Sequence, residues 1–313
     1  MGGAQVLHLP VLVEEVVAGL AVEADDRILD CTVGSGGHSL ALCQRLGPQG
    51  RLVGLDKDAA ALRRAEARLR GGGCAYTLVQ ADFRHLDRVL DALGLATVSK
   101  ILFDLGLSTE QLACSGRGFS FQRSEPLLMT FQEAGGEADL TAEKIVNTWS
   151  EQALAELLRT YGEERWARRI ARAIVRARQR QPLRTSRELA ELVARAVPPA
   201  ARHRRLHPAT RTFQALRIAV NDELGALREG LAKAFARLAP GGRLAVIAFH
   251  SLEDRLVKQA FRQWQAQGEA TVLTPKPITP SAQERQRNPR ARSAKLRLLL
   301  KSPPPRRTLQ GEG

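Results

Sequence analysis

The segment Asp30–Ser39 constrains most strongly how this chain of 313 residues can fold. It reads Asp-Cys-Thr-Val-Gly-Ser-Gly-Gly-His-Ser, follows an apolar run that ends in Ile28-Leu29, and precedes a helical pattern over 41–46. Glycines between a strand and a helix let the backbone approach a nucleotide-like ligand, and the helix N-terminus offers free N–H groups. The order of strand, glycine turn and helix therefore predicts a ligand site at this turn.

A second acidic residue supports the same site. The apolar strand Leu52–Leu55 ends at Asp56, which lies 22 positions after Gly34. A carboxylate at the end of the second strand is placed to accept hydrogen bonds from both ribose hydroxyls. The turn is Gly-Ser-Gly-Gly with Asp30 ahead of it, not the G-x-G-x-x-G that cradles a pyrophosphate. This form favours a site for S-adenosylmethionine over a dinucleotide site or a plain turn.

Further apolar runs alternate with helical segments along the first third of the chain. Runs at 76–79 and 101–103 predict a third and a fourth strand, so the pattern indicates an α/β fold with a mostly parallel sheet and helices on both faces. In such sheets ligands bind beyond the C-terminal ends of the strands. The sequence places Asp30, Asp56, Asp82 and Asp104 at those ends. We expect these carboxylates to form a polar rim around a cationic ligand.

The strand pattern stops near Ala113 and resumes after residue 206. Residues 116–136 are loop-like and 141–197 are helical, which predicts a helical domain inserted into the sheet domain. A long helix over 207–238, a strand over 243–249 and two antiparallel edge strands at 271–273 and 294–300 are expected to follow. The predicted organisation is a sheet domain of 1–112 and 206–301, an inserted domain of 113–205, and a disordered tail of 302–313.

Charge indicates the class of partner. Lys and Arg number 47 against 33 Asp and Glu, and the net charge of +14 favours a polyanion. A GC-rich genome explains the choice of arginine over lysine but not the excess of positive charge. In the inserted domain, one face of a predicted helix carries Trp166, Ile170, Ile174 and Ala177. Another face carries Arg165, Arg168, Arg169, Arg172 and Arg176. We interpret this arginine face as a phosphate-backbone contact rather than a merely solvated surface.

Two other features bound the class of protein. No apolar run approaches the length of a membrane span, and the N-terminus lacks a charged-then-apolar signal segment, so we expect a cytoplasmic protein without a membrane partner. The four cysteines, Cys31, Cys43, Cys74 and Cys114, show no C-x-x-C pairing and no nearby histidine pattern. Reduced, mostly buried thiols are therefore expected, and no metal site is predicted.

Eight motifs together carry a specific resemblance. They are His8–Leu12, the glycine turn with His38-Ser39, Asp104–Ser108, Arg117–Phe121, Tyr161–Arg165, His207–Arg217, Phe249–Arg255 and Asn288–Arg297. In these motifs the chain resembles the RsmH (MraW) family of S-adenosylmethionine-dependent methyltransferases, which make N4-methylcytidine in small-subunit (16S) ribosomal RNA. The match covers nearly the whole chain in order, and the later motifs are more diagnostic than the glycine turn.

The resemblance implies a class I, Rossmann-like methyltransferase fold interrupted by a helical domain. It implies S-adenosylmethionine as cofactor, and small-subunit ribosomal RNA or the assembling small subunit as partner; it leaves the oligomeric state open. The implied cofactor site consists of Gly36, Gly37, His38, Asp56, Phe83, Asp104 and Gln111. In it Asp56 would hold the ribose and Phe83 would lie against the adenine. Asp104 is the predicted catalytic acceptor. Candidate substrate contacts are Ser108, His250, Asp254 and the arginines Arg165, Arg169, Arg172 and Arg176.

One segment departs from the family pattern. Where family members carry Pro-Leu-Asp-Met-Arg-Met-Asp, residues 126–132 read Pro-Leu-Leu-Met-Thr-Phe-Gln, and Ala113 stands where an acid commonly follows the Gln-Leu pair. These changes lie beside the expected target-base pocket rather than at the cofactor. Two alternatives stay open: a methyltransferase of a DNA amine or a protein, and a non-catalytic ribosome-assembly factor on the same fold. The intact glycine turn and the strand-end acids disfavour the second.

Overall fold

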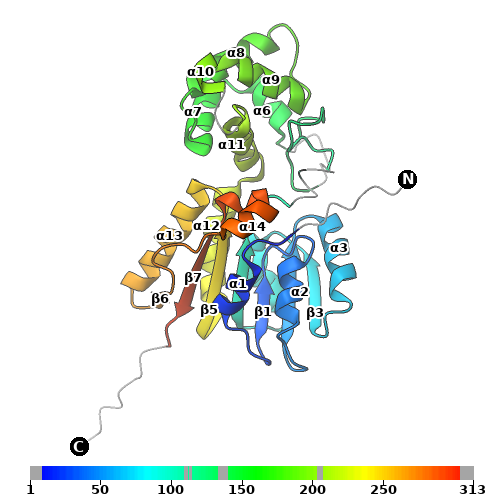
Figure 1. Ribbon diagram of the computed structural model, residues 1–313, viewed down its shortest axis with the longest axis vertical. Coiled ribbons are helices and arrows are strands. Elements are labelled where there is room, and N and C mark those ends of the chain that lie inside the picture. The colour runs from blue at the N-terminus through cyan, green and yellow to red at the C-terminus, as the bar shows by residue number, and fades with distance from the viewer. Residues whose placement is uncertain (1–8, 109–111, 113–114, 133–139, 203–206, 304–313) are drawn as a thin grey trace, which may run out of the picture. The chain divides into compact units, whose positions relative to one another are not determined.

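The computed structural model describes residues 9–108, 112, 115–132, 140–202 and 207–303 (Figure 1). His8, Gln111, Ala113, Cys114 and most of the predicted tail lie outside these residues. The chain divides into two compact units. A helical unit spans Leu107–Gly225, and a sheet unit combines His8–Gly106 with Ala226–Gly313. None of the helices in the described part of the chain is both long enough and apolar enough to cross a membrane.

A single seven-stranded sheet forms the sheet unit. Its strands are β1 (Arg27–Asp30), β2 (Arg51–Asp56), β3 (Ala75–Gln80), β4 (Val98–Asp104), β5 (Leu238–Ala248), β6 (Ala270–Val272) and β7 (Lys295–Lys301). Their order is β3-β2-β1-β4-β5-β7-β6, with the first five strands parallel and β7 antiparallel to both of its neighbours. This arrangement confirms the predicted Rossmann-like, mostly parallel sheet with an antiparallel edge.

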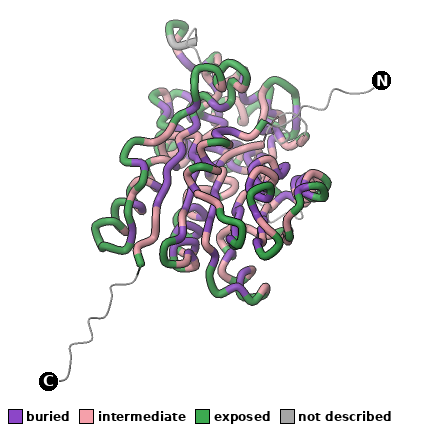
Figure 2. The backbone as a smooth tube through the Cα atoms, turned by 60° about the horizontal axis from the view of Figure 1, so that its bottom comes forward, coloured by how far each residue is buried: buried purple, intermediate pink, exposed green. Residues whose placement is uncertain are grey.

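Helices cover both faces of this sheet, as predicted. Consecutive strand residues point to opposite faces, so Ile28 packs in one core and its neighbour Leu29 in the other, both fully buried. Figure 2 shows the backbone coloured by burial, with buried positions in purple. One core includes α1 (Val13–Leu20), α2 (Gly37–Cys43) and α3 (Ala59–Leu69). The other includes α4 (Leu86–Ala92), α12 (Glu223–Arg237) and α13 (Ser251–Ala266). Continuous apolar strands follow directly from burial on both sides.

The helical unit has a hydrophobic core of its own. Its helices are α6 (Ala142–Thr148), α7 (Glu151–Gly162), α8 (Ala167–Arg178), α9 (Ser186–Ala196), α10 (Pro199–Arg202) and α11 (Thr210–Asn221). The side chains of Thr141, Ser150 and Thr185 accept hydrogen bonds from the first turns of α6, α7 and α9, which explains where these helices begin.

The predicted long helix over 207–238 is wrong. It is two helices, because Asp222 adopts a left-handed conformation with φ of 46° and ends α11 before α12 begins. Asp tolerates this conformation better than most residues. Because α11 packs on α7, with Gly162 close to the Arg211 carbonyl, the helical unit extends to residue 225 rather than to the expected 205.

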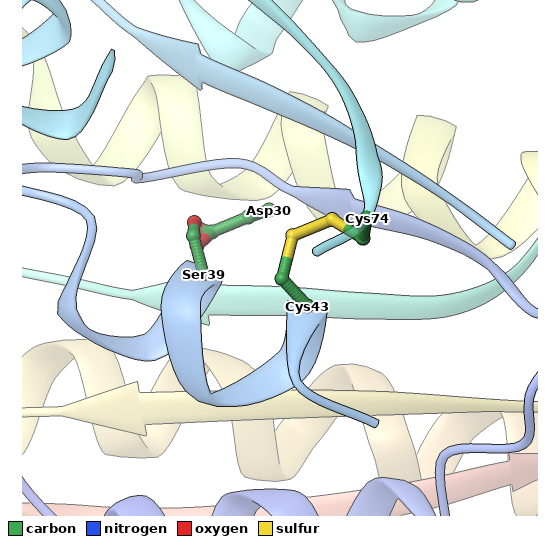
Figure 3. The surroundings of a disulfide bond; sticks show 4 residues. All are labelled: Asp30, Ser39, Cys43 and Cys74. Carbon is green, nitrogen blue, oxygen red and sulfur yellow. A yellow bond between two sulfur atoms is a disulfide. The ribbon is translucent and has the colours of Figure 1, made fainter. Parts of the chain in front are cut away.

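The expectation that all four cysteines are reduced is also wrong. Cys43, at the end of α2, and Cys74, directly before β3, form a disulfide across 31 residues of sequence (Figure 3). The pairing requires that α2 and the start of β3 be brought together by the fold, which no spacing pattern reports. Cys31 is free and buried.

The turn that carries Arg117–Phe121 permits a test of stability. Gly118 has a φ of 74°, and a Cβ there would lie 2.3 Å from the Pro126 carbonyl oxygen; Gly116 has a φ of 67° but open space around it. Both alanine variants suffer left-handed strain of about 1 kcal/mol, and only Gly118→Ala must also move backbone. We expect Gly118→Ala to lose roughly 3 kcal/mol of unfolding free energy in urea titrations. Equal losses in the two variants would contradict this account.

Candidate active site

The glycine turn lies between β1 and α2, at the point where the strand order reverses. Gly36 has a φ of 80°, and a Cβ there would approach the Ala65 Cα of α3 to 3.0 Å, so both conformation and space require glycine. The Gly34 N–H donates to Asp56 Oδ2 at 2.8 Å, which ties the turn to the end of β2. The predicted strand, turn, helix and spaced acid are therefore one structure.

The four strand-end acids share one edge of the sheet, as the parallel pairing of β3, β2, β1 and β4 requires. In three of them both carboxylate oxygens already have partners. These are Thr32 N and Ser39 Oγ for Asp30, Gly34 N and Asp58 N for Asp56, and Arg84 N and Lys57 Nζ for Asp82. In the fourth, Asp104, the buried Oδ1 has no hydrogen-bond partner among the described residues. The rim thus leaves one orphaned acceptor, at Asp104.

His38 and Thr32 fix the position of Asp104. His38 Nδ1 lies 3.3 Å from Asp104 Oδ2, and His38 Nε2 donates to the Val11 carbonyl at 2.8 Å. Because a carbonyl can only accept, Nε2 carries a proton. The Asp104 N–H donates to Thr32 Oγ1 at 2.6 Å. Burial alone would lower the pKa of His38, but the Asp104 carboxylate, the Val11 carbonyl and Asp30 together outweigh it and raise that pKa above its usual value, which favours an imidazolium–carboxylate pair.

Burial also changes the two acids beside the turn. It raises the pKa of Asp30 to about 6, despite the hydrogen bond from Ser39 (Figure 3). Burial likewise raises the pKa of Asp56, against the opposing hydrogen bonds from Asp58 N and Gly34 N. Each Asp56 oxygen accepts one of these bonds and retains a second lone pair. Asp56 can therefore still accept from a ligand without losing its hold on the turn.

Phe83 lies one residue beyond Asp82, in the short helix η1 (Phe83–His85). Its ring is half-buried and meets the Phe103 ring edge to face, with centroids 5.4 Å apart. Gly230 of α12 makes room for it, since a Cβ there would lie 2.6 Å from the Phe83 ring. The ring is thus anchored on the apolar core beside the acidic edge.

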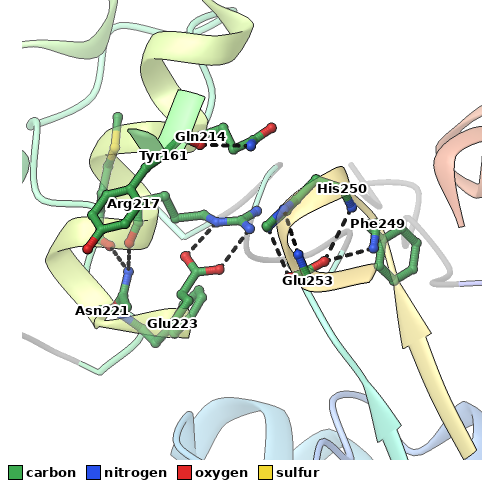
Figure 4. Close-up of polar contacts among 10 residues, drawn as sticks. Tyr161, Gln214, Arg217, Asn221, Glu223, Phe249, His250 and Glu253 are labelled. Carbon is green, nitrogen blue, oxygen red and sulfur yellow. Dashed lines mark hydrogen bonds and ion pairs between the residues drawn. The ribbon is translucent and has the colours of Figure 1, made fainter. Parts of the chain in front are cut away.

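His250 and Asp254 have contacts of their own within the sheet unit. His250 precedes α13, and its Nδ1 accepts from the Glu253 N–H, while Glu253 Oε2 accepts from the Phe249 and His250 N–H groups (Figure 4). Asp254 pairs with Lys295 and Arg297 of β7 at 3.0 and 2.7 Å. Capping and ion pairing account for these side chains structurally, and their predicted substrate contacts stay predictions.

The arginine face of α8 is exposed, and the opposite face is buried through Ile170 and Ile174, which confirms the predicted amphipathic helix. The exposed set is Arg168, Arg169, Arg172 and Arg176 of α8, together with Arg165, two residues before the helix. One arginine of the set has an acidic neighbour: Arg172 Nε lies 3.3 Å from Glu151 Oε1 of α7. Ser108 is half-buried just beyond β4, and its carbonyl accepts from Leu112 N.

The departing segment 126–132 is built into the helical unit. Leu127 and Met129 are buried in its core. Asn221 of α11 donates to the Met129 carbonyl and accepts from the Phe131 N–H (Figure 4). Nearby, Arg217 makes a bidentate pair with Glu223 at 2.7 and 2.8 Å, and Gln214 donates to the Tyr161 carbonyl. Gln214 and Arg217 of the His207–Arg217 motif therefore make hydrogen bonds and an ion pair within the helical unit.

Sequence reasoning missed three residues that organise the site. The Thr32 N–H and the Ser39 hydroxyl donate to the Asp30 carboxylate, and Thr32 Oγ1 also accepts from the Asp104 N–H. Lys57 pairs with Asp82. The spacing of two residues between Asp30 and Thr32 is the usual signal of an Asx turn and was available in the sequence. The partner of Ser39 depends on how the turn between β1 and α2 folds back on Asp30, and that of Lys57 on the pairing of β2 with β3.

The strand order, the glycine turn and the acid at the end of β2 define a Rossmann-like protein with a site for a nucleoside-containing cofactor. The chain belongs to the MraW methylase family, whose model matches residues 5–302. It is 47% identical over 309 residues to ribosomal RNA small subunit methyltransferase H of Symbiobacterium thermophilum, covering 94% of this chain and 96% of that one. The protein of the same name from a Synechococcus species is 51% identical over 307 residues, covering 94% and 92%.

Proposed function

We propose that this protein transfers a methyl group from S-adenosylmethionine to the N4 amine of a cytidine in small-subunit ribosomal RNA. The names of its relatives support the ribosomal RNA substrate. The observation that carries the chemistry is Asp104 Oδ1, a buried acceptor beside the glycine turn that has no hydrogen-bond partner among the described residues. Such a group is costly to bury unless a ligand completes its hydrogen bonding.

The residues around the turn fit the cofactor. Gly36 and Gly37 would bring the backbone against its methionine end, Asp56 would accept from the ribose hydroxyls, and Phe83 would present an apolar ring to the adenine. When bound, S-adenosylmethionine supplies an electrophilic methyl group on a sulfonium. Gln111, which lies outside the described residues, stays a prediction as a further contact.

Asp104 would act on the attacking amine. The exocyclic amine of cytosine is a poor nucleophile because its lone pair is delocalised into the ring. A carboxylate oxygen that accepts a hydrogen bond from the amine favours the developing positive charge and then takes the proton. His38 contributes by holding Asp104 Oδ2, which leaves Oδ1 for the amine. Ser108, four residues on, is a candidate to orient the base.

The substrate contacts beyond the base follow from charge and exposure. The exposed arginine face of α8 and a net charge of +14 suit the phosphates of folded RNA. The target cytidine must leave its stack to reach a buried acceptor, and a distorted RNA site lowers that cost. We infer that the substrate is small-subunit ribosomal RNA, free or in the assembling small subunit, in the cytoplasm.

Methyl transfer to ribosomal particles tests the proposal. Labelled S-adenosylmethionine would be incubated with this protein and small subunits from a strain that lacks the gene, followed by nucleoside mass spectrometry. We expect label as N4-methylcytidine. Naked small-subunit RNA, incubated in parallel, would distinguish the particle from free RNA as substrate.

Other outcomes would separate the alternatives. Label on DNA or protein but not on ribosomal RNA would identify a different acceptor and would implicate the altered 126–132 segment. Cofactor binding with no transfer to any of these substrates would favour a non-catalytic assembly factor. Either result contradicts the proposed function.

A further inference from the structure

The short helix α14 (Ala282–Arg287) has no buried residue, so apolar packing of the helix itself does not hold it in place. Within 281–290 only Glu284 and Asn288 are even half-buried. They are four residues apart and lie on the same side of the segment. Directly after them, Ala291 and Ala294 are buried in the same core as Val11 and Leu12.

Both half-buried side chains bind the beginning of the described chain, 272 and 279 residues away in sequence. The Leu12 N–H donates to Glu284 Oε1 at 2.8 Å, and Asn288 Nδ2 donates to the Leu9 carbonyl at 3.1 Å. In agreement, α14 lies beside α1 (Figure 1). We call Glu284 and Asn288 the strap residues, and Leu9–Leu12 the N-terminal segment.

Leu12 needs this support. It is buried, precedes α1, and has a left-handed backbone with φ of 57°, a conformation that is strained for leucine. The structure gives α1 no side-chain cap from Leu12 itself. Glu284 therefore satisfies the N–H of a buried residue at a strained position, and its loss would leave that N–H without its acceptor.

The N-terminal segment in turn contacts the candidate active site at two points. The Val11 carbonyl accepts the ring N–H of His38. The Pro10 side chain packs on Gly37, so closely that a Cβ there would lie 2.9 Å from Pro10 Cγ. The continuous path from Glu284 through Leu12 and Val11 thus ends on His38, whose other ring nitrogen holds Asp104.

We propose that Glu284 and Asn288 are positioning residues for methyl transfer. They hold the N-terminal segment so that the Val11 carbonyl sets the orientation of the His38 ring and, through it, of the Asp104 carboxylate. Neither strap residue touches the reacting groups. This assigns a role to the Asn288–Arg297 motif and to the helix before it. Its effect on turnover rests on the proposed function, whereas its effect on His38 does not.

Three variants test the proposal. Glu284→Ala removes the acceptor of the Leu12 N–H, Glu284→Gln retains an amide oxygen at the same place, and Gln283→Ala changes an exposed neighbour in the same helix. NMR of histidine-labelled protein without RNA would follow the protected ring N–H of His38, assigned by its loss in His38→Gln. We expect this signal in the wild type, Glu284→Gln and Gln283→Ala, and its loss in Glu284→Ala.

Kinetics would then follow the consequence for Asp104. A misplaced catalytic group lowers turnover more than binding, so kcat of Glu284→Ala should fall by roughly tenfold or more while KM for the RNA stays unchanged. Glu284→Gln should restore kcat to within about threefold of the wild type. If Glu284→Ala does not fold, Asn288→Ala takes its place in both measurements; it removes the bond to the Leu9 carbonyl and also the hydrogen bond that Asn288 Oδ1 accepts from the Arg290 N–H.

A purely structural strap gives a different result. Glu284→Ala would then have a lower melting temperature but would keep the His38 signal and full kcat at temperatures where it is folded, which would overturn the proposal. Loss of the signal in Gln283→Ala as well would overturn it too, because the effect would not be specific. If the wild type transfers no methyl group to RNA, the proposed function fails while the NMR comparison still decides the positioning role.

Discussion

Asp104→Ala is expected to lower kcat for methyl transfer by ~10²–10⁴-fold, the loss typical of a missing acid–base group. The variant removes the buried oxygen that has no other partner among the described residues and also releases His38. Asp104→Asn should lose nearly as much, since an amide oxygen keeps the shape but takes no proton from the amine. Single-turnover rates at saturating S-adenosylmethionine, with binding measured separately, isolate this step from cofactor affinity.

Arg172→Ala is the comparison variant, at a residue that we propose contacts the RNA. Arg172 is exposed on α8, so its loss should raise KM for the RNA several-fold and leave the rate of the chemical step unchanged. Its effect on kcat should be far smaller than that of Asp104→Ala. Unchanged turnover in Asp104→Ala would sink the catalytic role assigned to that carboxylate.

Much of the fold was predictable because the determining interactions are local or repetitive. Strands buried on both faces are apolar at most positions, as Ile28 and Leu29 of β1 are, and several such runs alternating with helical segments predict a parallel sheet. Parallel strands also align their C-terminal ends, so acids directly after apolar runs must share an edge. That rule predicts a shared edge for Asp30, Asp56, Asp82 and Asp104, and the strand pairing confirms it.

Two features that sequence reasoning missed depend on residues that are far apart in the sequence. Cys43 lies beside Cys74, and Glu284 beside Leu12, only in the folded arrangement of segments that are 31 and 272 residues apart in the sequence. The break at Asp222 has another origin, since an unbroken helical pattern carries no mark of a left-handed residue. The candidate site was predictable as a set of acids. Which oxygen remained unpartnered was not, because that depends on Thr32, Ser39 and Lys57 filling the others.

Asp56→Ala is expected to weaken binding of S-adenosylmethionine by roughly 10- to 100-fold, which corresponds to the loss of about 1.5–3 kcal/mol from hydrogen bonds to a charged group. Isothermal titration with the cofactor alone, without RNA, measures this directly. At saturating cofactor, kcat should change little, because Asp56 would hold the ribose and not the reacting amine.

The Asp56 carboxylate also accepts hydrogen bonds from Gly34 N and Asp58 N, so a control must separate loss of cofactor contacts from loss of these bonds within the protein. Asp58→Ala removes the N-cap of α3, since Asp58 Oδ1 accepts from Ala60 N, and leaves the Asp56 side chain in place. Asp58→Ala should therefore lower the melting temperature with near-normal cofactor affinity. If Asp56→Ala bound the cofactor as tightly as Asp58→Ala, the ribose would have to be held elsewhere, and the resemblance of this turn to other nucleoside sites would be one of shape alone.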